Sequence, residues 1–294
     1  MLIGPLSLHL QRYVEHQMAL LLLHQELGWE MGGIWPTERG VAKENAKYKV
    51  IVVDGFDSSK DIYLPLYQEL MDEVGVYIVS FDRAGYGESD PNPKRLVRSE
   101  AFDIQELADQ LKLGHRFYII GMSLGTLAVV NLVVPVINFW WPSFPPKLMN
   151  EVYKKRLKRD QWKLWIGHYA PGLHKVRQQR VCESLHRDII VHFGNWEFDP
   201  VEIKNPFPNN EASVHLWHGY EDTPVPYEMQ QYLVKKLPWI WCHEVPDGGH
   251  LMIHESGLCE AMGTLAWRRT LYLIGLLHPK PCIKKYTCIG IYAQ

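Results

Sequence analysis

Cysteine is scarce in this sequence, and no two cysteines form a C-x-x-C pair. The five cysteines are an odd number and cannot all pair within one chain, so we expect a reducing compartment and a cytoplasmic location. Neither sign of charge dominates, because 31 basic and 33 acidic side chains leave a formal charge of -2. The overall charge therefore gives no indication of nucleic acid or of an acidic membrane surface as a partner.

Long apolar runs are also missing. The most leucine-rich stretch, residues 18–23, spans six residues, whereas a transmembrane helix needs about 20. This stretch follows His and Gln rather than a basic segment, so it does not match a secretory signal peptide. We expect neither a transmembrane span nor a signal peptide.

What the chain does have is an alternation of short apolar runs with segments of helical spacing. At 294 residues it is long enough for one large α/β domain with a cap. The predicted order is strand 48–53, helix 64–74, strand 76–81, helix 102–111 and strand 117–120, then strand 214–217, helix 227–237 and strand 240–245. Nearly all-apolar strands between helices predict a mostly parallel sheet with helices on both faces.

The segments outside this alternation complete the predicted organisation. Residues 1–47 are predicted as a helix at 8–27 followed by a loop at 29–47, because the loop shows no sustained apolar alternation. A core of residues 48–138 and 211–277 contains a candidate strand at 133–138 and a closing helix at 259–277. Residues 139–210, rich in Trp, Pro and basic side chains, interrupt the sheet and are predicted as a helical cap insertion. Residues 278–294 are predicted as an irregular tail.

One motif in the predicted core indicates a nucleophile. Gly121-Met-Ser123-Leu-Gly125 follows a predicted strand and precedes an apolar segment, which is the context of a G-x-S-x-G turn. Small residues two before and two after the serine allow the sharp turn that exposes its hydroxyl. An ordinary Gly-Ser turn is the alternative interpretation.

A serine needs a base, and the base needs an orienting acid. His250 follows the predicted strand 240–245 behind two glycines, and Asp222 follows the strand before it. Carboxyl ends of parallel strands share one edge of a sheet, so we expect these side chains to meet Ser123 there. Glu221 is a rival for Asp222. His250 and His254 have i, i+4 spacing but lack the H-E-x-x-H pattern, so we expect no metal and no cofactor.

The backbone amides of Leu124 and Phe56 are the candidates for stabilising an oxyanion. Leu124 follows the serine, and Phe56 belongs to the Asp54-Gly55-Phe56 loop after the first parallel strand. A plain glycine turn is the alternative for this loop. Asp54 is unusual there, because its carboxylate would oppose developing negative charge if it faced the site.

These motifs, together with the stretch SFDRAGYGESDP at 80–91, resemble the α/β-hydrolase superfamily, and most closely a family of plant α/β-hydrolase-fold proteins. The resemblance covers about residues 42–253 and includes VINFWWPSFP at 136–145, ESLHRD at 183–188, NWEFD at 195–199 and NPFPNN at 205–210. It implies an α/β-hydrolase fold with Ser123, Asp222 and His250 as catalytic residues. The antiparallel opening strands of the superfamily are not recognisable ahead of residue 42, and the tail beyond about residue 260 does not match.

One connection looks too short for the fold. Only residues 122–132 join the strand before Ser123 to the candidate strand 133–138, which is close to the minimum for a parallel crossover. Pro135 cannot donate to a sheet, which further weakens that strand. The resemblance implies more helix here and around 173–178, so we infer internal deletions and an incomplete fold.

The pattern as a whole predicts a serine hydrolase that cleaves a carboxylic ester or related acyl substrate. A catalytically impaired or ligand-binding homologue is the alternative. Four tryptophans of the cap, Trp140, Trp141, Trp162 and Trp165, would favour a mainly apolar small-molecule substrate, although we expect most of them to pack in the core. Oligomeric state does not follow from the sequence.

Overall fold

The computed structural model describes residues 34, 36–62, 64–126, 131–170, 180–196, 198–209, 212–254, 258 and 287–289. The helices predicted at 8–27 and 259–277 lie outside these residues. Within the described residues, no helix combines the length and apolar character required to cross a bilayer.

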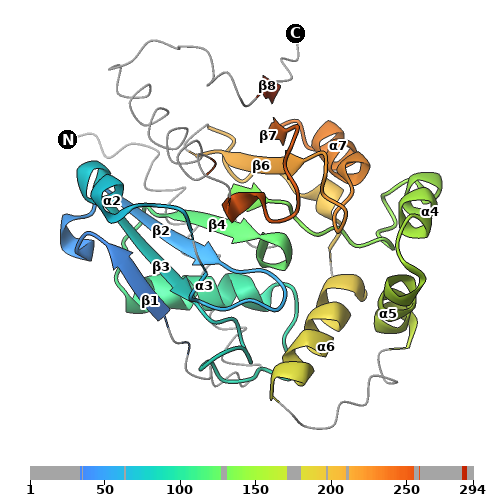
Figure 1. Cartoon of the computed structure of the whole chain (residues 1–294), viewed down its shortest axis with the longest axis horizontal. Helices are drawn as coiled ribbons and strands as arrows, with labels where there is room; N and C mark the ends of the chain where they lie inside the picture. The colour runs from blue at the N-terminus through green and yellow to red at the C-terminus, as the bar shows by residue number, and fades with distance from the viewer. Residues whose placement is uncertain are drawn as a thin grey trace, which may run out of the picture. The chain divides into compact units, whose positions relative to one another are not determined.

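The described strands form a single sheet in the order β1-β3-β2-β4-β5-β6-β7-β8 (Figure 1). Their bounds are β1 Pro36–Gly40, β2 Tyr48–Val53, β3 Val76–Phe81, β4 Tyr118–Met122, β5 Asn131–Val133, β6 Val214–Gly219, β7 Ile240–Val245 and β8 Thr287–Ile289. All pairings from β3 through β2 to β7 are parallel, and β1 and β8 are added antiparallel at the two edges. The predicted α/β class with a mostly parallel sheet is confirmed.

Among the residues that the structure describes, three α-helices flank the sheet: α2 Gln68–Val74, α3 Ser99–Gln110 and α7 Tyr227–Lys236. On β2, Ile51 and Val53 pack with buried residues of α3, whereas Val50 and Val52 pack with the cluster that contains Met71 of α2. This split follows from the two-residue period of a strand, which sends neighbouring side chains to opposite faces. Both faces of the sheet are covered at β2 and β3, so these strands are apolar almost throughout.

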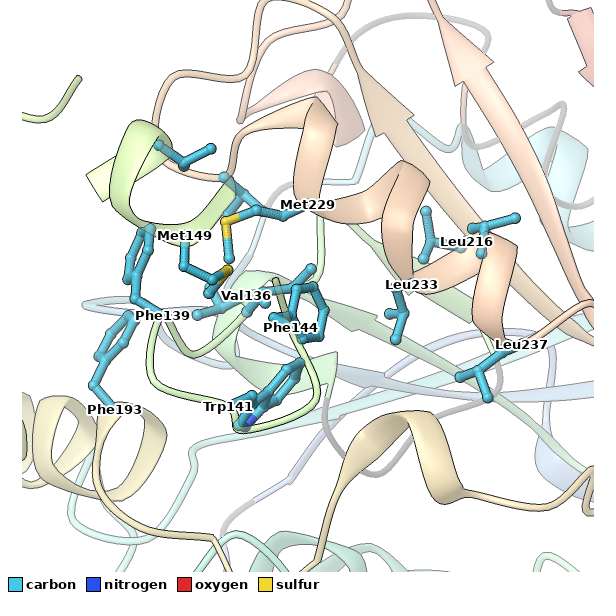
Figure 2. Close-up of a cluster of buried hydrophobic side chains, with 14 of the residues drawn as sticks. Val136, Phe139, Trp141, Phe144, Met149, Phe193, Leu216, Met229, Leu233 and Leu237 are labelled. Carbon is cyan, nitrogen blue, oxygen red and sulfur yellow. The ribbon is translucent and has the colours of Figure 1, made fainter. Parts of the chain in front are cut away.

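In the described part of the chain between β5 and β6 there are three further α-helices: α4 Pro146–Lys154, α5 Lys158–Tyr169 and α6 Arg180–Phe193. Figure 2 shows how this segment joins the sheet domain, with Phe139, Met149 and Phe193 in the same buried cluster as Leu216 of β6 and Met229 of α7. The cluster is continuous across the junction, so α4 and α6 are held to the sheet domain by apolar contact rather than by the connecting chain alone.

The structure corrects the prediction of a loop over 29–47. Residues 36–40 form β1, which pairs antiparallel with β3 from Pro36 opposite Phe81 to Gly40 opposite Tyr77. The sequence PTERG contains no apolar residue, so it shows no strand pattern. An edge strand can be formed through backbone hydrogen bonds alone, and charged residues and proline are common at sheet edges.

The candidate strand at 133–138 is also wrong in its bounds. The strand β5 is short, Asn131–Val133, and the chain leaves the sheet at Val134, which has a left-handed φ of 45°. The apolar run that suggested a strand continues past this point because Val136 and Ile137 are buried outside the sheet. At the other end of the chain, β8 lies within the stretch predicted as an irregular tail.

Candidate active site

Ser123 stands at the sharp turn between β4 and the short 3-10 helix Ser123–Thr126, and its backbone has a φ of 50°. Few residues other than glycine adopt this conformation, which points to a strained turn. A Cβ on Gly125 would lie 2.3 Å from the carbonyl oxygen of Asp54, so only glycine fits there. Gly121 is buried at the end of β4. The chain therefore turns sharply from strand to helix at Ser123, with glycine required at position 125.

The three polar side chains predicted to meet do so at one edge of the sheet. His250 Nε2 lies 3.0 Å from Ser123 Oγ, and His250 Nδ1 lies 2.9 Å from Asp222 Oδ2. Asp222 is 5% exposed and Ser123 is 8% exposed. The carboxyl ends of β4, β6 and β7 place these residues, as expected for parallel neighbouring strands.

Asp222 rather than Glu221 faces His250. The Glu221 side chain is exposed to solvent, whereas Asp222 is buried and accepts a further hydrogen bond from the amide of Val225 through Oδ1 at 2.8 Å. That bond fixes the carboxylate in its loop. In the described part of the chain, no group of three or more His, Cys, Asp or Glu side chains is placed to hold a metal ion.

The two peptide units that carry the candidate oxyanion amides are anchored through their carbonyl groups. Arg83 Nη2 donates to the carbonyl oxygen of Gly55 at 2.7 Å, and the amide of Val136 donates to the carbonyl oxygen of Ser123 at 3.2 Å. A trans peptide is planar, with its N–H opposed to its C=O. Fixing each carbonyl therefore fixes the direction of the following amide, on Phe56 and on Leu124.

Asp54 does not face the pocket. Its carboxylate is 1% exposed and lies 3.4 Å from Nε of Arg83, as an ion pair rather than a hydrogen bond. Burial raises the pKa of Asp54 to about 6, and the positive charge of Arg83 opposes that rise. The carboxylate thus lies beside Arg83 within the protein and does not line the pocket.

Arg83 also belongs to a buried cluster that the sequence did not identify. Its guanidinium donates to Glu100 Oε1 at 2.9 Å and to Asp188 Oδ2 at 2.6 Å, and Asp188 of α6 also pairs with Arg95. The hydroxyl of Tyr86 donates to Asp188 Oδ2 at 2.6 Å. Arg83, Tyr86 and Asp188 lie in stretches that match the resembled family, whereas Arg95 and Glu100 do not, and nothing in their spacing indicates that these residues converge.

A pocket of about 430 Å³ opens over Ser123 and His250. Gly55, Phe56 and Leu124 line it beside the serine. Its wall is mainly apolar and includes Ile137, Phe139, Leu164, Ile189, Phe193 and Met229. Such a pocket binds an apolar group next to a few polar side chains.

The predicted packing of the tryptophans is only half correct. Trp141 is buried at 6% exposure and Trp140 is partly buried, but Trp162 is 63% exposed and Trp165 is 41% exposed. Neither Trp162 nor Trp165 lines the pocket. These two side chains on α5 therefore serve neither the core nor the apolar wall around Ser123.

The parallel sheet with a nucleophile-type turn at its carboxyl edge defines an α/β protein of the hydrolase type. A model of the alpha/beta hydrolase family matches residues 50–260, and the chain belongs to this family.

Solved structures agree with this fold at low sequence identity. Alpha/beta hydrolase domain-containing protein 10 from mouse is 15% identical with a TM-score of 0.52, and the match covers 83% of this chain and 96% of that one. A malate-bound thermophilic esterase from Thermogutta terrifontis is 18% identical with a TM-score of 0.53, over 81% and 93% of the two chains. A carboxylesterase structure from the thaumarchaeon Nitrososphaera gargenis is 10% identical with a TM-score of 0.53, over 82% and 96%.

Proposed function

We propose that this protein is a serine hydrolase that cleaves a carboxylic ester or a related acyl substrate through an acyl-enzyme. The observation that carries the proposal is the hydrogen-bonded chain from Ser123 Oγ to His250 Nε2, and from His250 Nδ1 to Asp222. A serine hydroxyl is a weak nucleophile at neutral pH, so it needs a base at this distance.

The proposed reaction uses these groups in sequence. His250 Nε2 takes the hydroxyl proton as Ser123 Oγ attacks the ester carbonyl carbon, and Asp222 stabilises the resulting imidazolium. The amides of Phe56 and Leu124 donate to the oxyanion. His250 then gives its proton to the leaving alkoxide, and water repeats the same steps to release the acid and regenerate Ser123.

The pocket supports a mainly apolar acyl or alcohol group as the preferred part of the substrate. Its wall is formed by aliphatic and aromatic side chains contributed by the segment between β5 and β6, including Phe139, Leu164 and Phe193. We propose that residues 139–210 act as a cap that forms this wall. The esterases among the similar structures are consistent with such a substrate.

We also propose that the chain is a shortened member of its family, of the plant type that its sequence resembles. Residues 123–130 alone connect β4 to its parallel neighbour β5, whereas parallel crossovers usually take a dozen residues or more.

Cys242 is a free thiol, which supports a reducing location such as the cytoplasm.

Labelling and turnover together test the proposed function. We expect a fluorophosphonate probe to label Ser123, and Ser123→Ala to lose both labelling and hydrolysis of p-nitrophenyl esters by about 10⁴-fold or more. Ser58→Ala is the matched control, because Ser58 lines the same pocket; it should keep both. Longer acyl chains should lower KM relative to acetate.

Equal turnover by the native protein and Ser123→Ala would disprove the enzyme proposal. Binding of an apolar ester without turnover or labelling would instead support the alternative of an impaired, ligand-binding homologue. In that case, lengthening the short connection between β4 and β5 is the first change to test for restored turnover.

A further inference from the structure

The helix α5 presents aromatic side chains to solvent. Trp162 is 63% exposed, Trp165 is 41% exposed and Tyr169 is 57% exposed. With Lys158 they are spaced by four, three and four residues, so they form one stripe along the helix. Ring centroids are 5.7 Å apart between Trp162 and Trp165 and 5.5 Å apart between Trp165 and Tyr169, so the stripe is continuous.

The opposite side of α5 explains why this stripe faces outward. Leu164 and Gly167 are buried, and a Cβ on Gly167 would lie 2.6 Å from Ile189 Cγ2 of α6. Close packing against α6 therefore fixes the rotation of α5. A surface helix normally turns polar side chains to water, so an exposed aromatic stripe requires another explanation.

The same region carries a local excess of positive charge. Residues 154–163 read KKRLKRDQWK, with Asp160 as their one acidic residue. Lys158, Arg159 and Lys163 are exposed on α5. Arg159 lies 3.5 Å from Asp160, but both side chains are open to solvent, so screening makes that pair weak. The formal charge of the whole chain is -2, so this local basic patch is not evident from the net charge.

Part of the same segment reaches the pocket. Arg156, Asp160, Lys163 and Leu164 line the pocket over Ser123, whereas the aromatic stripe faces away from it. A partner that covers the stripe would therefore lie close to the substrate pocket without filling it.

We propose that α5 docks this protein on an anionic lipid bilayer. Tryptophan and tyrosine favour the bilayer interface, where an apolar ring and a polar group are both accommodated. Lysine and arginine beside them are attracted to anionic headgroups. A lipid interface satisfies the two indoles, the phenol and the charge together. Docking would also bring apolar acyl substrates near the pocket; this last step rests on the proposed function.

Vesicle flotation with the full chain tests the docking. Vesicles of phosphatidylcholine with phosphatidylserine should carry the native protein upward, whereas vesicles of phosphatidylcholine alone should carry much less. Added salt should weaken the binding because it screens the charges. Ser123→Ala should bind as the native protein does, so docking is measured independently of any activity.

Two sets of variants divide the contributions. Lys158→Glu with Arg159→Glu should weaken binding to the anionic vesicles by about tenfold or more. The matched control reverses two exposed basic residues elsewhere, Lys94→Glu with Arg116→Glu, and should bind nearly as the native protein does.

The aromatic stripe is tested by Trp162→Ser with Trp165→Ser, which should also lose binding. Tyr67→Ser, which removes a ring that is 66% exposed at the residue before α2, is its control. Turnover of a short ester dissolved in water should stay unchanged in all these variants, since none of the altered residues lines the pocket.

Several results would overturn the proposal. The docking proposal is wrong if the native protein stays unbound at high concentrations of anionic vesicles. It is also wrong if the α5 variants bind these vesicles as well as the control variants do. Binding to RNA or to an acidic polypeptide with the same dependence on α5, without vesicle binding, would assign the surface to that partner instead.

Discussion

Arg83 Nη2 donates a hydrogen bond to the carbonyl oxygen of Gly55 across 2.7 Å. The bond links a buried ion cluster to the loop that carries Phe56, whose amide is the proposed oxyanion donor. Arg83 is 1% exposed and lies within ion-pair distance of Asp54, Glu100 and Asp188, so one guanidinium both pairs with three carboxylates and holds the loop. Stability and catalysis should therefore respond together when Arg83 is changed.

Arg83→Lys should reduce both properties. A lysine keeps the charge but cannot reproduce the planar fork that reaches Glu100, Asp188 and Gly55 together. Leaving buried carboxylates underpaired should lower the free energy of unfolding by about 2–4 kcal/mol. Because the amide of Phe56, the proposed oxyanion donor, would lose its anchor, kcat should fall more than KM rises. Urea denaturation and ester kinetics measure the two effects.

Arg116→Lys is the control for this change, since Arg116 is exposed. If Arg83→Lys lost stability but kept its kcat in the fraction that remains folded, the orienting role would be wrong and the cluster would be structural only.

Asp222→Asn separates the two neighbouring acids that the sequence left as rivals. The neutral amide cannot stabilise the imidazolium, and its NH2 group can donate to Nδ1 and hold the imidazole in the wrong tautomer, so turnover should fall by about 10³–10⁴-fold. Glu221→Gln, one residue away on an exposed side chain, should leave turnover unchanged. Comparing kcat for the two variants at neutral pH measures the effect, and the reverse ranking would contradict the assignment of Asp222.

Much of the sheet and the meeting of Ser123 with His250 could be predicted from the sequence because both follow local rules. Apolar runs mark β2, β3, β4, β6 and β7, and the carboxyl ends of parallel strands share an edge. The strand β1 could not be found, since PTERG contributes only backbone hydrogen bonds. The bounds of β5 were wrong because a buried apolar run continued beyond the sheet.

The ion cluster around Arg83 lay beyond sequence reasoning for a different reason. Asp188 is 105 positions from Arg83 in the chain, and only the packing of α6 brings the two together. A charged residue in a sequence is most often on the surface. To predict that a charged side chain is buried, one must know which helix covers it. The sequence predicted a helical cap insertion between β5 and β6 but not the bounds of its helices.

Asp103 should make stability depend on pH. Burial, with the charge of Glu100 in addition, raises the pKa of Asp103 to about 7, from 3.8 in an unperturbed aspartate. The native state then binds a proton more tightly than the unfolded state, so the contribution of this residue to stability declines as pH rises from about 4 to about 7. Above that range the loss should be constant.

Asp103→Asn should remove this decline, because the amide stays neutral at every pH. Its free energy of unfolding should match the native value near pH 4 and exceed it at pH 8, by an amount on the order of a few kcal/mol. Urea denaturation across this range measures the difference. Asp109→Asn on the exposed side of the same helix is the control. If the difference in unfolding free energy between Asp103→Asn and the native protein did not change with pH, the raised pKa of Asp103 would be contradicted.

Lys112 offers a stabilising change at the end of α3. The helix ends in a Schellman motif, with the amide of Leu113 bonded to the carbonyl of Ala108 and that of Lys112 bonded to the carbonyl of Asp109. Lys112 occupies the left-handed position with a φ of 52°, where glycine is favoured. Lys112→Gly relieves the left-handed strain but adds freedom to the unfolded chain, so stability should rise by about 1 kcal/mol. Lys112→Ala keeps a Cβ and should show no such gain, so thermal unfolding of the two variants isolates the backbone strain from loss of the charged side chain.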